Sequence, residues 1–147
     1  MATNIFAELQ EGRTTSSAEE TQSLAARLAA ALPPDATLAL HGNLGVGKTT
    51  FVQGLARGFG IHDSITSPTY TLFHLYRGAR TLVHLDAYRL ENERQIDALM
   101  LEDFLTSPFC LAVEWPERIA VWIPQDALHL ELSIVETQRH RVRLRAP

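Results

Sequence analysis

A glycine-rich loop between two apolar segments is the feature of this sequence that most constrains its fold. Residues 42–49 read Gly-Asn-Leu-Gly-Val-Gly-Lys-Thr and match the pattern G-x-x-x-x-G-K-[ST] at every fixed position. The apolar run at residues 36–40 precedes this loop and predicts a buried strand, whereas residues 50–59 carry apolar side chains at helical spacing. A strand, a glycine loop and a helix in this order form the setting in which the pattern binds phosphate.

Each fixed residue of this pattern has a chemical task. The glycines let successive backbone amides point at phosphate oxygens, and the following helix offers its positive N-terminal end. In such a loop the lysine, here Lys48, reaches the β and γ phosphates, and the hydroxyl of Thr49 ligates Mg²⁺. Lys48 is the only lysine in the chain, which fits a position where a compact ammonium suits better than the planar fork of arginine. The candidate nucleotide-binding residues of the loop are Asn43, Leu44, Gly45, Val46, Gly47, Lys48, Thr49 and Thr50.

Two acidic residues compete for a second role at this site, which is to hold or orient the Mg²⁺ shell. Asp86 ends the β-prone run at residues 81–85, and Glu114 ends the apolar run at residues 109–113. Either acid could lie at the carboxyl edge of a sheet, where α/β folds bind ligands, or be a surface acid at a strand end. Arg89 could stabilise phosphoryl charge or pair with Asp86, and the sequence leaves both roles open.

Two further segments near these motifs could each have a functional or a structural role. Residues 67–70 read Ser-Pro-Thr-Tyr and could form a switch-like loop that senses the γ-phosphate, or an ordinary proline turn. Trp115 follows Glu114 directly and could contact the ligand or serve in packing. The six histidines show no metal-ligand spacing with another histidine or with cysteine, so we do not expect a zinc site.

Helical and strand patterns alternate along the rest of the chain. Ser17 and Glu20 have the capping-box spacing at the start of a predicted helix over residues 18–31. The further expected elements are a hairpin of residues 70–76 and 81–85, a helix marked by Ile96, Met100 and Phe104, a short helix over residues 117–122, and an antiparallel ribbon of residues 128–134 and 141–145. We therefore expect an α/β fold with a mainly parallel central sheet and an antiparallel C-terminal hairpin.

The charge of the chain argues against broad contact with nucleic acid. The formal net charge is −4, so neither DNA nor RNA would be held by an extended basic surface. A local basic stripe comes from Arg139, Arg141, Arg143 and Arg145, which project to one side of the last predicted strand. This stripe could contact a phosphate, a partner or RNA, but a charge-protected edge strand is the commoner explanation.

Length and composition limit the organisation of the chain. Its 147 residues predict a single domain spanning residues 1–147. A single cysteine, Cys110, offers no disulfide framework and fits a reducing cytoplasm. The N-terminus carries acidic residues instead of a basic start and an apolar run, and no apolar stretch approaches the roughly 20 residues that cross a bilayer. We therefore expect a cytoplasmic protein with no membrane role.

Four motifs taken together resemble one family. They are Gly42-Asn43-Leu44-Gly45-Val46-Gly47-Lys48-Thr49-Thr50, Ser67-Pro68-Thr69-Tyr70, His84-Leu85-Asp86-Ala87-Tyr88-Arg89-Leu90 and Glu114-Trp115-Pro116-Glu117. In this order they are similar to TsaE (formerly YjeE), the small bacterial ATPase of tRNA threonylcarbamoyladenosine biosynthesis. The resemblance implies a P-loop NTPase-like three-layer fold. Two departures are small, since Asn43 stands where the family often has aspartate and Val46 where it usually has alanine.

The resemblance also implies cofactors, partners and roles. It implies ATP and Mg²⁺ as cofactors, and TsaB and TsaD as partners through which tRNA is met indirectly. Lys48 would be catalytic and would hold phosphate together with the loop amides, and Thr49 and Glu114 would hold Mg²⁺. Asp86 would assist hydrolysis, and Trp115 would lie beside the nucleotide. Both competing acids thus gain a role.

Two other functions share the loop. A small-molecule kinase needs an acceptor pocket and an arginine-rich lid, for which residues 77–80 are the only candidate. A nucleotide-dependent assembly module would use ATP to select a conformation with little turnover. A guanine-nucleotide switch is disfavoured, because its base-reading Asn-Lys-x-Asp needs a lysine and the only one is Lys48.

Overall fold

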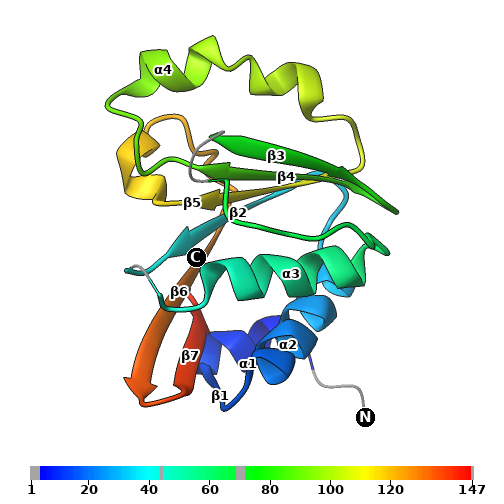
Figure 1. Ribbon diagram of the computed structural model, residues 1–147, viewed down its shortest axis with the longest axis vertical. Helices are drawn as coiled ribbons and strands as arrows, with labels where there is room; N and C mark the ends of the chain where they lie inside the picture. The colour runs from blue at the N-terminus through cyan, green and yellow to red at the C-terminus, as the bar shows by residue number, and fades with distance from the viewer. Residues whose placement is uncertain (1–3, 44, 69–71, 147) are drawn as a thin grey trace.

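The computed structural model describes residues 4–43, 45–68 and 72–146. The elements are α1 (Ile5–Glu11), β1 (Arg13–Thr15), α2 (Ala18–Ala31), β2 (Ala36–His41), α3 (Lys48–Gly58), β3 (Phe73–Arg77), β4 (Thr81–Asp86), α4 (Glu93–Ala98), the 3₁₀ helix η1 (Leu101–Phe104), β5 (Phe109–Glu114), the 3₁₀ helix η2 (Pro116–Ile119), β6 (Leu128–Glu136) and β7 (Arg139–Leu144). Within these ranges, no helix has the length and apolar character that crossing a bilayer requires. Helices and strands alternate along most of the chain, and β3–β4 and β6–β7 follow each other directly (Figure 1).

The strands form one seven-stranded sheet in the order β1-β7-β6-β2-β5-β4-β3. Its centre is parallel, because β2 pairs in parallel with β5 and β6, and β5 pairs in parallel with β4. Antiparallel strands extend it on both sides, with β3 against β4, and β7 and β1 beyond β6. The predicted mainly parallel sheet with an antiparallel C-terminal hairpin is confirmed.

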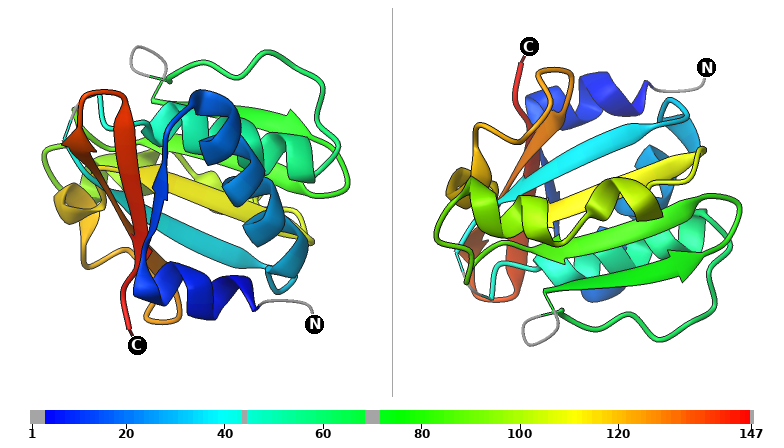
Figure 2. Two further views of the ribbon diagram at one scale, coloured as in Figure 1. Left: turned by 90° about the horizontal axis from the view of Figure 1, so that it is seen from below. Right: turned by 90° about the horizontal axis from the view of Figure 1, so that it is seen from above.

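Helices cover both faces of this sheet, which gives three layers (Figure 2). One core lies between the sheet and α1, α2 and α3, and it contains the fully buried Leu28, Leu40 and Phe51. The second core lies between the other face and α4, η1 and η2, with Ile96 and Leu111 at its centre. Successive strand residues point to opposite faces, so β4 and β5 supply side chains to both cores.

Several predicted elements are confirmed in detail. Helix α2 spans the predicted residues, and its capping box forms, since the Ser17 hydroxyl accepts a hydrogen bond from the Glu20 amide at 3.1 Å. Strands β2 and β5 and helix α3 also lie within about one turn of their expected limits. The hairpin of β3 and β4 forms with the expected antiparallel pairing, although residues 70 and 71 at its predicted start lie outside the described residues.

The prediction of one helix through Ile96, Met100 and Phe104 is wrong, because two short helices, α4 and η1, occupy this segment. Met100 has a left-handed backbone, with φ of 53°, and separates α4 from η1. This turn rotates the following residues relative to the spacing of a continuous helix. As a result, Leu101 is fully buried while Met100 is 59% exposed. The short helix expected over residues 117–122 is the 3₁₀ helix η2 and starts at Pro116.

The N-terminal elements were not predicted, and they change the position of the last strand. Strand β1 pairs with β7, so β7 lies inside the sheet and not at its edge. The charge-protected edge strand expected at the arginine stripe is therefore wrong. Arg143 and Arg145 instead donate hydrogen bonds to Glu131 of β6 at 3.2 and 3.0 Å. Arg139 forms an ion pair with Glu136 at 3.7 Å.

Candidate functional site

The loop between β2 and α3 has the backbone that its glycines predict. Gly45 and Gly47 have φ values of 80° and 101°, a region that side-chain-bearing residues rarely adopt. Gly47 comes directly before α3, and no side chain caps the first turn of that helix. The first amides of α3 therefore keep their capacity to bind an anion, and the helix dipole favours negative charge at this end. Leu44 lies outside the described residues.

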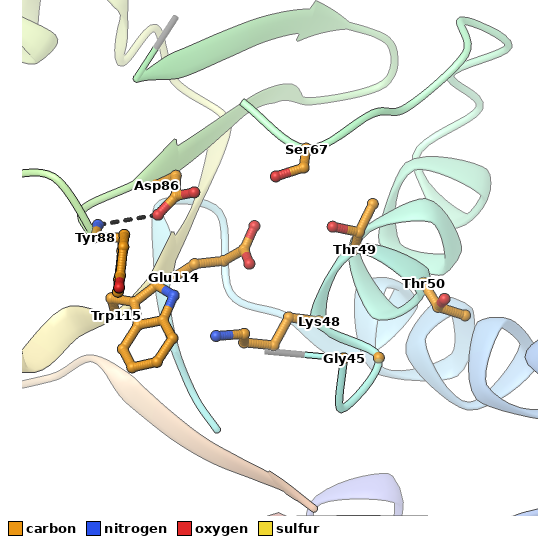
Figure 3. A pocket seen from close by; sticks show the side chains of 10 residues that line it. Gly45, Lys48, Thr49, Thr50, Ser67, Asp86, Tyr88, Glu114 and Trp115 are labelled. Atoms are coloured by element: carbon orange, nitrogen blue, oxygen red, sulfur yellow. Dashed lines mark hydrogen bonds between the residues drawn. The ribbon is translucent and has the colours of Figure 1, made fainter. Parts of the chain in front are cut away.

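Lys48 lies buried at the start of α3. Its side chain is directed along the cavity towards Trp115 (Figure 3). The Lys48 Nζ donates a hydrogen bond to the Gly42 carbonyl at 2.7 Å and lies 4.1 Å from the centre of the Trp115 ring. Burial lowers the pKa of Lys48 below its ordinary value, against the opposing effect of Glu114 and Asp86. The ammonium contacts a carbonyl and an aromatic face, and it can exchange both for a stronger anionic ligand.

The two competing acids lie side by side. Asp86 ends β4 and Glu114 ends β5, and because these strands are parallel and in register, the two residues are direct partners. Both are buried, and both point to the α3 side of the sheet, where they line one cavity with Lys48. The Asp86 carboxylate accepts a hydrogen bond from the Tyr88 amide at 2.9 Å. The structure therefore brings both acids to the carboxyl edge of the sheet, where either could hold or orient Mg²⁺.

A histidine to which the sequence analysis assigned no role contacts one of these acids. His84 lies two residues before Asp86, on the same face of β4, and it is fully buried. Its Nε2 lies 2.6 Å from Oε2 of Glu114. The signal in the sequence was the alternation of His84 and Asp86 along an otherwise apolar strand. What the sequence did not give was the partner, since Glu114 lies on another strand.

Trp115 covers one side of the cavity together with Tyr88. Trp115 has a left-handed backbone, with φ of 56°, which turns its side chain away from the direction of β5. Its ring centre lies 5.0 Å from that of Tyr88, and the guanidinium of Arg118 lies 5.4 Å from the Tyr88 ring. The Trp115 ring therefore contacts both Lys48 and Tyr88 at the cavity. It can serve in packing and also contact a ligand.

These groups line a cavity of about 420 Å³ (Figure 3). Its lining includes Ser67 and most of the predicted site residues, namely Gly45, Gly47, Lys48, Thr49, Thr50, Asp86, Glu114 and Trp115. Asn43 and Val46 instead line a second cavity, on the side of the loop that faces β6. The Val46 carbonyl accepts a hydrogen bond from His140 Nδ1 of β7 at 3.0 Å, so the C-terminal ribbon contacts the loop directly. Thr69 and Tyr70 lie outside the described residues.

The parallel sheet, the glycine loop at its carboxyl edge and the helix that follows define a P-loop NTPase-like protein. The comparisons with known proteins agree with this class. A crystal structure of YdiB from Bacillus subtilis superposes with a TM-score of 0.75 and 32% identity, and the match covers 90% of this chain and 82% of that one.

Residues 15–142 match the family model described as "Threonylcarbamoyl adenosine biosynthesis protein TsaE". The TsaE of Bacillus subtilis is 41% identical over 116 residues, which cover 78% of this chain and 72% of that protein. The TsaE of Rickettsia bellii is 36% identical over 125 residues, which cover 84% and 86%. Both relatives are named tRNA threonylcarbamoyladenosine biosynthesis proteins. This chain belongs to the TsaE family.

Proposed function

We propose that this chain is the ATP-binding and ATP-hydrolysing subunit required for N6-threonylcarbamoyladenosine modification of tRNA. In this proposal it works in the cytoplasm with TsaB and TsaD and sustains their turnover, and it meets tRNA through that complex. The observation that carries the proposal is the convergence of Lys48, Asp86 and Glu114 on one cavity beside the glycine loop, in a chain of this family. The net charge of −4 supports indirect contact with tRNA.

The loop and the start of α3 are suited to the phosphates of ATP. The amides of Gly45 and Gly47 and the first turn of α3 would hold the phosphate oxygens. Lys48 would exchange the Gly42 carbonyl for the β and γ phosphates, which gives its buried charge an anionic partner. A cavity of about 420 Å³ is within the size range of small-molecule sites.

The oxygen donors of the cavity fit Mg²⁺. Thr49 supplies a hydroxyl and Glu114 a carboxylate, and both are hard ligands that Mg²⁺ prefers. The described residues contain no cluster of three histidine, cysteine or acidic side chains that could enclose a metal. This donor set suits a cation that takes its remaining ligands from phosphate and water. When bound, Mg²⁺ would neutralise charge on the phosphate oxygens.

In this proposal Asp86 assists hydrolysis. One carboxylate oxygen is held by the Tyr88 amide, which leaves the other to orient the attacking water. Lys48 stabilises the charge that develops on the transferred phosphoryl group. Trp115 and Tyr88 limit the access of bulk water on one side of the cavity.

The geometry does not favour a small-molecule kinase. Residues 77–80, its only candidate lid, form the turn before Thr81, at the end of β4 opposite to Asp86. Arg80 donates hydrogen bonds there to the carbonyls of Leu32 and Pro33. That turn therefore lies at the end of the sheet opposite to the glycine loop.

The proposal is tested with a reconstituted modification reaction. TsaB, TsaD, the threonylcarbamoyl adenylate donor and tRNA are combined with the intact chain, Lys48→Ala or Arg57→Ala, and modified nucleoside is counted per complex over many turnovers. Arg57 lies in the last turn of the same helix and is exposed, so its variant is a matched loss of one cation outside the site. Isothermal titration measures ATP binding by each variant.

We expect sustained turnover with the intact chain and with Arg57→Ala, but not with Lys48→Ala. Hydrogen bonds to charged groups contribute about 1.5–3 kcal/mol, so Lys48→Ala should weaken ATP binding by about 10- to 100-fold. Sustained turnover that needs ATP binding without ATP hydrolysis would favour the assembly module. Turnover that ignores the chain altogether would refute the proposal.

A further inference from the structure

A fully buried histidine, His84, contacts the carboxylate of Glu114. His84 is fully buried and Glu114 is 5% exposed, and the 2.6 Å contact between His84 Nε2 and Glu114 Oε2 lies below the floor of the site. In the part of the chain that the structure describes, His84 is the one hydrogen-bond partner of this carboxylate. We infer that His84 is a positioning residue, which fixes Glu114 Oε2 so that Oε1 is presented to the cation of the nucleotide.

The hydrogen-bond pattern of the imidazole supports this assignment. A carboxylate oxygen of Glu114 accepts this hydrogen bond, so Nε2 of His84 is its donor. Among the described residues, Nδ1 is the one buried side-chain nitrogen or oxygen that has no hydrogen-bond partner. A side chain that served core packing alone would not bury a ring nitrogen without a partner, and its chain neighbours Val83 and Leu85 are apolar. The single bond that His84 does make is therefore the reason for its presence.

The neighbouring carboxylate explains why Glu114 needs a fixed donor. Asp86 and Glu114 are register partners at the ends of parallel strands, and two ionised carboxylates so placed repel each other. The Tyr88 amide holds Asp86, and His84 holds Glu114, so each acid is anchored by a separate donor. Figure 3 shows the carboxylate of Glu114 reaching into the space between Asp86, Lys48 and Thr49. Without His84, the side chain of Glu114 loses the bond that sets its orientation.

The inference rests on the proposed function, because it concerns a cation bound with ATP. It is tested by a pair of substitutions that differ in one donor. The amide nitrogen of His84→Gln stands three bonds from Cβ, as Nε2 does, and can donate to Glu114. His84→Met has the same unbranched length without a donor, and methionine adapts to the space that is left. Each variant is compared with the parent by calorimetric titration of ATP, first with excess EDTA and then at increasing Mg²⁺.

We expect His84→Met to raise the Mg²⁺ concentration at half-maximal ATP binding by about tenfold or more, the usual loss when a partner of a metal ligand is removed. His84→Gln should stay within about threefold of the parent, and ATP binding in EDTA should differ little among the three proteins. The orientation role also predicts that His84→Met has no further effect on Mg²⁺ dependence when Glu114→Gln is already present.

Three results would overturn the inference. An unchanged Mg²⁺ dependence in His84→Met would leave the proposed function intact and remove the role of His84 alone. An equal loss in His84→Gln and His84→Met, already present in EDTA, would mean that the histidine only supports the core. Absence of any Mg²⁺-dependent ATP binding by the parent chain would refute the proposed function and the inference with it. If His84→Met does not fold, His84→Asn takes its place, because its amide ends at the position of Nδ1 and cannot reach Glu114.

Discussion

Gly54→Ala is the substitution for which the structure predicts a result opposite to that of local sequence rules. Gly54 lies in the interior of α3, where alanine would ordinarily add about 1 kcal/mol of stability through helix propensity. In the structure, however, a Cβ at this position would lie 2.4 Å from the Gln22 carbonyl oxygen and 2.7 Å from the Ala25 Cβ. Helices α2 and α3 therefore pack against each other at a point that only glycine permits.

The size of the effect follows from these contacts. Ordinary van der Waals contact begins at 3.4 Å, so the backbone of α2 must move away by about 1 Å. Overpacking typically costs about 1–3 kcal/mol, and a conflict with main-chain atoms that cannot rotate away belongs at the upper end of that range. After subtraction of the propensity gain, we expect Gly54→Ala to lower the free energy of unfolding by about 2 kcal/mol. For a domain of this size, Tm should fall by about 4–8 °C.

The assay is urea denaturation followed by circular dichroism, with an exposed site in α2 as the control. Ser23 is exposed within that helix, so the difference between Ser23→Gly and Ser23→Ala measures helix propensity without a packing conflict. We expect alanine to be the more stable of that pair by about 1 kcal/mol. A gain of similar size in Gly54→Ala would refute the reasoning, because it would mean that α2 and α3 do not approach at Gly54.

Cys110, Glu8 and Trp115 allow simpler measurements. Burial raises the pKa of the Cys110 thiol to about 12, so iodoacetamide at pH 8 should label the folded chain at least about a hundredfold more slowly than the chain in urea, and equal rates would contradict the buried position. The hydrogen bond from Arg27 lowers the pKa of Glu8, so this acid stabilises the fold above its unfolded pKa and loses that effect as pH falls through the folded value. Glu8→Gln should therefore lower Tm at pH 7, with a difference from the parent that closes below about pH 4, and a constant difference would argue against the ion pair. Nucleotide should draw Lys48 away from the Trp115 ring, so tryptophan fluorescence should change saturably on addition of ATP and lose that change in Trp115→Phe.

Local patterns predicted those elements whose form depends on nearby residues. The capping box of Ser17 and Glu20 placed the start of α2, and the glycine-rich pattern placed the loop between β2 and α3. Helical spacing failed after Ile96, because Met100 adopts a left-handed conformation that periodicity does not reveal. Strand β1 was missed because it has only three residues and pairs with β7, more than a hundred positions further along the chain.

The sequence by itself determined the chemical class of the site, because the loop of residues 42–49 uses contiguous residues whose spacing is enough to define a phosphate-binding backbone. Only the tertiary structure decided which side chains complete it. Asp86, Glu114 and His84 belong to two strands, and the parallel register of β4 and β5 brings them together. That register depends on the packing of both faces of the sheet against helices from distant parts of the chain. No local pattern carries this information, so the contact between His84 and Glu114 appears only when the sheet is assembled.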